Sequence, residues 1–282
     1  MKLRPNLILT SILITLALSG CIGIESENIQ HDYSIYNRST NCNASNFSIV
    51  DSPVKYVSVN GIETGYREFG SGEPLLMIMP FATKMDMCNA SFVKQLSSGY
   101  RVILFDNRGM GYSSDNNEPL SISLLVNDTA GLMDTLGLDS VHIFGSSMGS
   151  VIAQELTLAH PEKVNRLILS STTYSLDAPE ANILKSKLQY RSTDPDTNQI
   201  LRKYAQANLK WNGTYERLPE IQNKVLLLSA NKDALTPPDI SIKMAQNIPD
   251  AKFVRFDGGG HLGEQYLPEE YANEILSFLA SE

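Results

Sequence analysis

The residues of this chain best suited to chemistry begin with a serine in a tight turn. Ser147 is the third residue of the motif GSSMG at residues 145–149, which follows a short apolar run and precedes a helix-like apolar pattern. A strand, a tight turn of small residues and a helix lift a serine hydroxyl clear of a sheet on a strained backbone. Free N–H groups at the start of such a helix face charge that develops on a reacting carbonyl. The pattern predicts that Ser147 is a nucleophile; the alternative is a turn with no catalytic role.

A serine hydroxyl needs a base, and the base needs an orienting partner. The chain has four histidines. His31 lies in a polar N-terminal segment, His142 lies inside a predicted strand, and His160 ends a predicted helix, so ordinary structural roles explain these three. His261 lies in the loop DGGGHLG at residues 257–263, just after the last predicted strand, where three glycines leave the ring room to reach the serine. We therefore predict that His261 is the base.

The orienting carboxylate is expected between the last two predicted strands. Asp233 directly follows the strand predicted at residues 225–228. Its alternative role is to cap the helix that comes next in the chain. Asp239 and Asp177 are the substitutes if Asp233 does not have this role, and Asp177 follows an earlier strand. We predict that Asp233 orients the base.

These groups need a sheet whose strand ends meet at one edge. Short apolar runs alternate with amphipathic helical segments, which is typical of a mostly parallel sheet covered by helices on both faces. An Asn-Gly pair between the first two runs predicts a tight antiparallel hairpin. The predicted strands are residues 54–59, 63–69, 75–79, 102–105, 141–144, 167–170, 225–228 and 252–256, and the predicted helices are residues 122–136, 151–160, 240–245 and 270–279.

One stretch interrupts the alternation of strands and helices. Residues 172–222 contain no strand pattern but two helix-like segments, at 181–190 and 199–211. This is the expected position of a helical lid above the carboxyl edge of the sheet, where ligands bind in α/β proteins. Aromatic side chains in the lid are candidates to line a substrate pocket, although they also have the simpler role of packing the lid onto the domain. The candidates are Tyr174, Tyr204 and Trp211.

The order of these motifs resembles that of the α/β-hydrolase fold, in the branch of esterases, lactonases and related serine hydrolases with a G-x-S-M-G motif. The resemblance covers residues 54–279 and implies an α/β-hydrolase fold. In the segment FDNRGMGYS, Asp106 and Arg108 are expected to be structural partners rather than catalysts. The matching motifs are residues 77–81, residues 105–113, the GSSMG turn, and the acid and base in the chain order Ser147, Asp233, His261.

The chain departs from the family at the oxyanion hole. The family commonly has His-Gly followed by a donor residue after the third strand, whereas this chain has Met79-Pro80-Phe81. Proline has no backbone N–H, so Pro80 donates no hydrogen bond. The resemblance then implies that Phe81 supplies one backbone donor and Met148, the residue after the nucleophile, supplies the other.

The implied chemistry is acyl transfer through an acyl-enzyme on Ser147. We expect a carboxylic-ester hydrolase acting on a small-molecule acyl substrate, with no cofactor, no metal and no obligate protein partner. Peptidase, lactonase, thioesterase or carbon–carbon hydrolase activity is the alternative within enzymes, since one triad supports them all. A binding lipoprotein without catalysis is the alternative from another class.

The N-terminus predicts export and lipid anchoring. Residues 1–20 have a basic start and a short apolar core, and LSGC at their end resembles the lipobox of prokaryotic lipoproteins, in which Cys21 is lipidated. An ordinary secretory leader is the alternative. Residues 21–50 are polar enough to form a flexible tether, so the hydrolase domain is expected at residues 51–282, outside the cytoplasm and anchored to the cell membrane.

Charge and cysteine usage narrow the possible partners. The formal net charge is −8 with no internal basic cluster, which argues against nucleic acid as a partner.

The chain has three cysteines. If Cys21 is lipidated, Cys42 and Cys88 remain as an even pair in an oxidising compartment, so a disulfide between them is a hypothesis.

Overall fold

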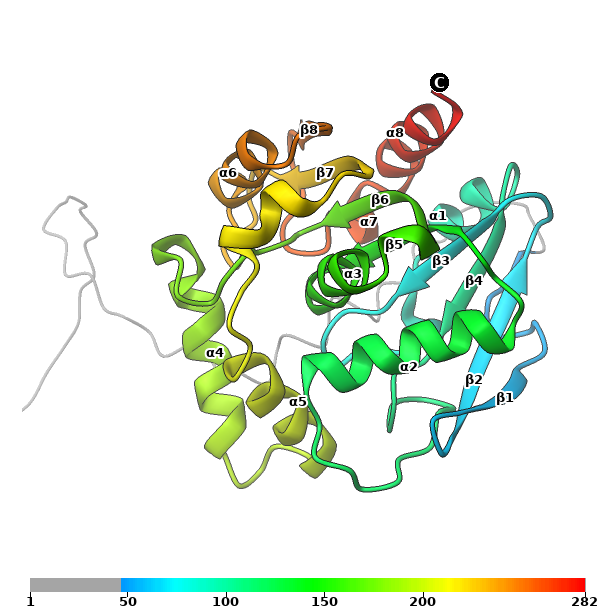
Figure 1. The fold of residues 1–282 in the computed structure, drawn as a ribbon, viewed down its shortest axis with the longest axis horizontal. Coiled ribbons are helices and arrows are strands. Elements are labelled where there is room, and N and C mark those ends of the chain that lie inside the picture. Colours follow the sequence, from blue (N-terminus) through cyan, green and yellow to red (C-terminus); the bar gives the residue numbers. More distant parts are fainter. Residues whose placement is uncertain (1–46, 282) are drawn as a thin grey trace, which may run out of the picture. The chain divides into compact units, whose positions relative to one another are not determined.

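A single sheet organises residues 47–281, which are the residues described by the computed structural model of this protein (Figure 1). The strand order is β1-β2-β4-β3-β5-β6-β7-β8. The β1–β2 and β2–β4 pairs are antiparallel and every other pair is parallel, which confirms the predicted sheet. The strands are β1 Lys55–Val59, β2 Ile62–Phe69, β3 Pro74–Ile78, β4 Arg101–Phe105, β5 Val141–Ser146, β6 Val164–Ser170, β7 Lys224–Ala230 and β8 Ala251–Phe256.

The hairpin between β1 and β2 has the turn that its Asn-Gly pair predicts. Asn60 and Gly61 have φ angles of 47° and 75°, both in the left-handed region that a tight hairpin turn requires. Asn and Gly are the residues that adopt this conformation at least cost. The turn sets the register in which Val59 lies opposite Ile62.

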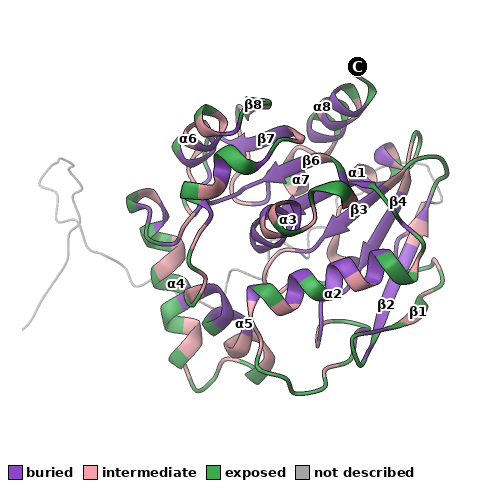
Figure 2. Cartoon of the chain, in the orientation of Figure 1, coloured by how far each residue is buried: buried purple, intermediate pink, exposed green. Residues whose placement is uncertain are grey.

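Helices cover both faces of the sheet because neighbouring strand residues point in opposite directions. Leu76 and Ile143 belong to the apolar cluster under α2, α3 and α6, while Leu75 and Phe144 belong to the cluster under α1 and α8. Figure 2 shows the resulting pattern of buried strands and helices with exposed outer faces. The helices are α1 Ala90–Leu96, α2 Ile122–Thr135, α3 Met148–Ala159, α6 Pro238–Asn247, α7 Gly263–Tyr266 and α8 Pro268–Ala280.

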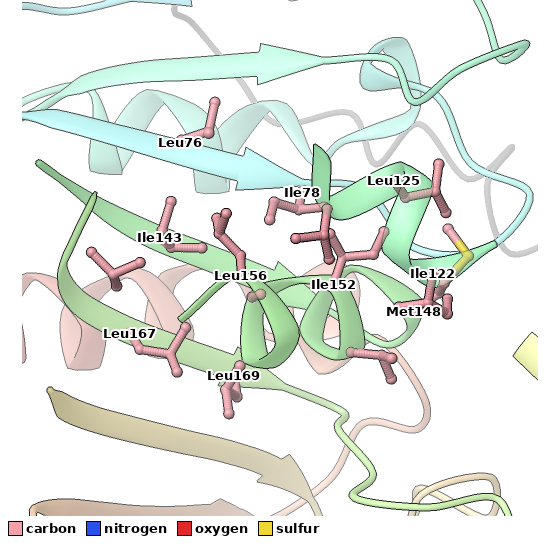
Figure 3. Packing of buried hydrophobic residues seen from close by; sticks show 14 of the residues in the cluster. Leu76, Ile78, Ile122, Leu125, Ile143, Met148, Ile152, Leu156, Leu167 and Leu169 are labelled. Carbon is pink, nitrogen blue, oxygen red and sulfur yellow. The ribbon is translucent and has the colours of Figure 1, made fainter. Parts of the chain in front are cut away.

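Helix α3 is central to the first cluster. Ile152 and Leu156 point from this helix toward Ile78 and Ile143 of the sheet (Figure 3). Burial of such aliphatic side chains contributes about 1.5–3 kcal/mol each to folding. The same packing fixes the start of α3, and with it the serine turn, against the ends of β3 and β5.

The segment predicted as a lid contains two helices between β6 and β7. Helices α4 Asn182–Thr193 and α5 Gln199–Leu209 pack on each other at one end of the domain (Figure 1). Leu188 of α4 and Ala205 of α5 form a small apolar cluster with Leu176, and Phe81 packs against it. The inner surface of the two helices therefore contacts the loop after β3.

The folded domain starts earlier than predicted, and several residues of the predicted N-terminal segments lie outside the described residues. Ile49 is 4 % exposed, and the Phe47 ring packs on Phe69 with centroids 5.3 Å apart, so the folded domain includes residues 47–50, which were predicted to belong to the tether. Residues 1–20, Cys21 and Cys42 lie outside the described residues, while Cys88 has a free thiol. Within residues 47–281, no helix is long and apolar enough to span a membrane.

Candidate active site

The GSSMG turn has the strained geometry that its sequence predicts. Ser147 lies between β5 and α3 with φ 52° and ψ −118°, a conformation that costs about 1–3 kcal/mol in a residue with a side chain. The turn is possible because strand and helix approach closely at two glycines. A Cβ atom at Gly145 would lie 2.4 Å from the Gly149 carbonyl oxygen, and one at Gly149 would lie 2.1 Å from the Ile78 carbonyl oxygen.

Replacing Gly149 with alanine is expected to lower the free energy of unfolding by about 3 kcal/mol, because the new methyl group would push α3 away from β3. The neighbouring atom belongs to the backbone, so no side chain can move aside. Denaturant unfolding measures the change. Gly99→Ala is the matched control, since its Cβ would meet nothing closer than a Leu276 methyl group at 3.8 Å. Equal stability of the two variants would contradict the close approach.

The structure brings the predicted nucleophile, base and acid together. His261 Nε2 lies 2.8 Å from Ser147 Oγ, and His261 Nδ1 lies 2.9 Å from Asp233 Oδ2. With the ring proton on Nδ1, this nitrogen donates to the carboxylate and Nε2 accepts from the serine hydroxyl. The three side chains come from the loops after β5, β7 and β8, whose carboxyl ends meet at one edge of the sheet.

Asp233 is held in its ionised form. The residue is 3 % exposed, and this burial alone would raise the pKa of the carboxyl group. The nearby His261 ring and hydrogen bonds from His261 and Thr236 outweigh burial, so the pKa of Asp233 is lowered. The Thr236 backbone N–H and hydroxyl donate over 2.9 and 2.8 Å. A second backbone donor, Leu235 N–H, lies 2.9 Å from Oδ1.

The loop that carries His261 is fixed by its backbone. Gly258 and Gly259 have φ angles of 98° and 65°, so these glycines are needed for their conformation as well as for their small size. Leu262 has a φ of 63°, and its backbone N–H donates to Ser171 Oγ over 3.1 Å. This bond ties the residue after the base to the end of β6.

Phe81 and Met148 remain the candidate oxyanion donors. Met148 is the first residue of α3, so its N–H is one of the groups at the start of the helix that have no acceptor within the helix. The Met148 side chain lies in the core. Phe81 lies in a tight turn in which the Pro80 carbonyl oxygen accepts from the Thr83 backbone and hydroxyl over 3.4 and 2.8 Å. Among the turn, loop and cap hydrogen bonds of the backbone within residues 47–281, none is donated by Phe81 N–H or Met148 N–H.

Helices α4 and α5 both contact the Phe81 side chain. Its ring meets the Tyr204 ring edge-on with centroids 6.4 Å apart, and Arg191 lies 5.8 Å from the ring centre. Tyr204 is itself buried, and its hydroxyl donates to the Arg108 carbonyl oxygen over 2.8 Å. Tyr204 is therefore the predicted pocket residue that contacts a candidate site residue directly.

The other two predicted pocket residues have packing contacts. Tyr174 packs on Tyr215 with ring centroids 4.8 Å apart. Trp211 Nε1 donates to Glu155 Oε1 over 2.7 Å, two turns along α3 from the serine. Their contacts agree with the simpler role, which is to hold the lid against the domain.

Asp106 and Arg108 are structural, but they are not partners of each other. Arg108 Nε and Nη2 donate to the two Asp128 oxygens, both over 2.7 Å. Asp106 instead accepts from the backbone N–H groups of Met85 and Tyr112 over 2.7 and 2.8 Å. The expectation of a mutual pair was wrong because Asp128 approaches Arg108 from α2, a contact that the local motif does not encode.

The remaining histidines and carboxylates considered for the site lie elsewhere. His142 Nε2 is bonded to Glu73 over 3.0 Å, and burial lowers the pKa of the His142 ring. His160 caps the end of α3. Asp177 pairs with Lys185 on α4, and Asp239 lies in the first turn of α6, so neither replaces Asp233.

Sequence reasoning missed two residues around the triad. Thr236 supports Asp233, and its position three residues further along was a local signal, because Asp side chains commonly accept from nearby backbone N–H groups. Glu264, three residues after His261, is buried beside the GSSMG turn, where it accepts a hydrogen bond from Ser146. An acidic residue so close to a candidate base was the available signal for Glu264.

Comparisons with known proteins agree with this fold. The family model described as alpha/beta hydrolase fold matches residues 73–203 and 187–263. A Mycobacterium tuberculosis protein named "Putative non-heme bromoperoxidase BpoC" is 28% identical over 259 residues, covering 78% of this chain and 98% of the relative. A 2-hydroxy-6-oxo-6-phenylhexa-2,4-dienoate hydrolase of Burkholderia cepacia is 27% identical over 279 residues, covering 80% and 96%. The structure of a thermophilic esterase from Thermogutta terrifontis shares the fold with a TM-score of 0.68 and 23% identity, covering 81% of this chain and 98% of the esterase.

Proposed function

This chain belongs to the alpha/beta hydrolase fold family, and we propose that it is a serine hydrolase that cleaves carboxylic esters. The observation that carries the proposal is the continuous hydrogen-bonded line from Ser147 through His261 to Asp233. A hydroxyl, an imidazole and an ionised carboxylate in this order form a nucleophile, a base and a group that orients the base.

In the proposed reaction, Ser147 Oγ attacks the ester carbonyl carbon while its proton passes to His261 Nε2. Asp233 stabilises the imidazolium that forms, and the Phe81 and Met148 N–H groups bind the negative oxygen. His261 then gives the proton to the leaving alcohol oxygen, and the carbon–oxygen bond breaks to leave an acyl-enzyme. Water adds to the acyl carbon with His261 as base, which releases the acid and restores the serine.

An uncharged acyl group suits the apolar residues beside the Phe81 ring, whose centre also has the Arg191 side chain 5.8 Å away. The lid contributes Leu176, Leu188 and Ala205 to the cluster that packs against this ring, and none of the three has a polar side chain. Apolar walls with a few polar groups are typical of sites for small neutral ligands. We therefore expect short and medium acyl esters to be better substrates than charged ones.

The test combines a substrate series with a covalent probe. We expect the protein to react with a fluorophosphonate probe at one serine. We also expect it to hydrolyse p-nitrophenyl esters, with the highest rate for short or medium acyl chains. Mass spectrometry of the probe-labelled protein identifies the modified residue. Absence of labelling, or labelling away from Ser147, would overturn the proposal.

A second candidate reaction comes from one relative. The Burkholderia cepacia protein is named as a hydrolase of 2-hydroxy-6-oxo-6-phenylhexa-2,4-dienoate, a substrate without an ester bond. The side chains of Ser147, His261 and Asp233 could also support hydrolysis of a carbon–carbon bond next to a ketone. Adding this compound to the substrate series distinguishes ester hydrolysis from carbon–carbon hydrolysis. We expect kcat/KM for the preferred substrate class to exceed kcat/KM for the other class by about tenfold or more.

A further inference from the structure

A buried carboxylate outside the triad lies directly behind the nucleophile turn. Glu264 is 4 % exposed and belongs to α7, three residues after His261. The Ser146 hydroxyl donates to Glu264 Oε1 over 2.5 Å, and the Ser170 hydroxyl donates to Oε2 over 2.9 Å. Each carboxylate oxygen therefore has its own hydroxyl partner, although no step of the proposed reaction uses this group.

The two serines belong to the framework of the nucleophile. Ser146 directly precedes Ser147 at the end of β5, and Ser170 lies opposite Ser146 in the parallel register of β5 and β6. The Ser147 backbone N–H donates to the Ser170 carbonyl oxygen over 3.0 Å. Because the two hydroxyls lie side by side at the sheet edge, one carboxylate can bond to both.

Glu264 lies on the same short segment as the base. From His261, the chain passes through Leu262, whose left-handed backbone is bonded to Ser171, and enters α7 at Gly263. A Cβ atom at Gly263 would lie 2.0 Å from the Tyr271 hydroxyl, so α8 closes this segment from the other side. The Glu264 bonds thus join the segment that carries the base to the strands that carry the nucleophile.

Burying the Glu264 carboxylate in these surroundings costs free energy that its hydrogen bonds must offset. Burial raises the pKa of Glu264, while hydrogen bonds from Ser146 and Ser170 and the nearby His261 ring oppose that change. A pocket on this side is lined largely by apolar and sulfur-containing side chains, including Met79, Cys88 and Phe144. A carboxylate is tolerated in such surroundings only when it is hydrogen-bonded, and here each of its oxygens accepts from a buried serine hydroxyl.

We propose that Glu264 is a positioning residue that sets the distance between His261 and Ser147 by bonding Ser146 and Ser170. The proposal rests on the proposed hydrolase function. Misplacing a reacting group by about 1 Å costs on the order of 10²-fold in rate. Substrate binding depends on other surfaces, so the effect should appear in kcat and leave KM nearly unchanged.

The variants Glu264→Leu and Glu264→Gln test this role. Leucine keeps the volume but removes both acceptors, and we expect kcat to fall about 10²-fold with KM changed by less than about threefold. Glutamine keeps the shape and can accept from one serine while donating to the other, so kcat should stay within about tenfold of the wild type. The matched control is Glu270→Leu, at an exposed position on α8.

Folding and chemistry are separated by titrating active sites with the fluorophosphonate probe and by thermal unfolding. A folded Glu264→Leu protein with wild-type kcat would overturn the proposal, as would equal losses in the leucine and glutamine variants. If the leucine variant does not fold, Ser146→Ala removes one bond, and an unchanged kcat in that variant would count against the role. A wild-type protein that the probe does not label would instead refute the proposed function itself.

Discussion

Ser147→Ala is expected to lower kcat for the best p-nitrophenyl ester by about 10⁴–10⁶-fold. The hydroxyl that His261 deprotonates would be absent, so no acyl-enzyme could form. The backbone donors and the binding surface would remain, and they account for the residual rate over water. Initial rates at saturating ester, corrected for active protein, measure the change.

The substitution should leave the fold intact. Alanine keeps the Cβ atom and hence the same strained backbone as Ser147, so the free energy of unfolding should change by less than about 0.5 kcal/mol. Ser147→Gly is an informative companion, because glycine adopts a φ of 52° without strain and should be more stable by roughly 1 kcal/mol while equally inactive. An alanine variant with more than a hundredth of wild-type kcat would refute the nucleophile assignment.

The central part of the sheet is predictable from the sequence because its strands are buried on both faces. A buried parallel strand reads as a continuous apolar run, and the run at residues 75–79 differs from β3 by one residue at each end. Helix α3 starts three residues before the apolar pattern at residue 151, because small residues at the close approach to β3 break the periodicity. Helix α1 was missed because its seven residues are too few to establish a period.

The convergence of the three triad side chains is predictable for a topological reason. In a parallel sheet, every loop after a strand emerges at the same edge, so Ser147, Asp233 and His261 are neighbours although up to 114 residues separate them. The partners of each group are harder to predict. Glu264 faces Ser146 and Ser170 only because β5 and β6 pair in one register, which single-sequence patterns do not specify.

Asp233→Asn is expected to lower kcat by about 10⁴-fold while the ring stays close to the serine. An amide has no negative charge to stabilise the imidazolium, and its NH₂ group favours the wrong His261 tautomer. The Thr236 backbone N–H can still donate to the amide oxygen, so the loop should keep its shape. The ratio of wild-type to variant kcat at neutral pH measures the loss, and Asp239→Asn, in the first turn of α6, is the control.

The same variant tests the charge of Asp233 through its effect on stability. The pKa of this carboxyl is lowered in the folded protein, so its ionised form stabilises the fold above the unfolded-state pKa of about 3.9. This contribution disappears as the pH falls from there through the lower folded-state pKa, and the asparagine variant has no such contribution to lose. The difference in unfolding free energy between wild type and Asp233→Asn should therefore shrink on acidification below about pH 4. A difference that stays constant, or grows, over that range would mean that His261 and Thr236 do not hold a carboxylate at this position.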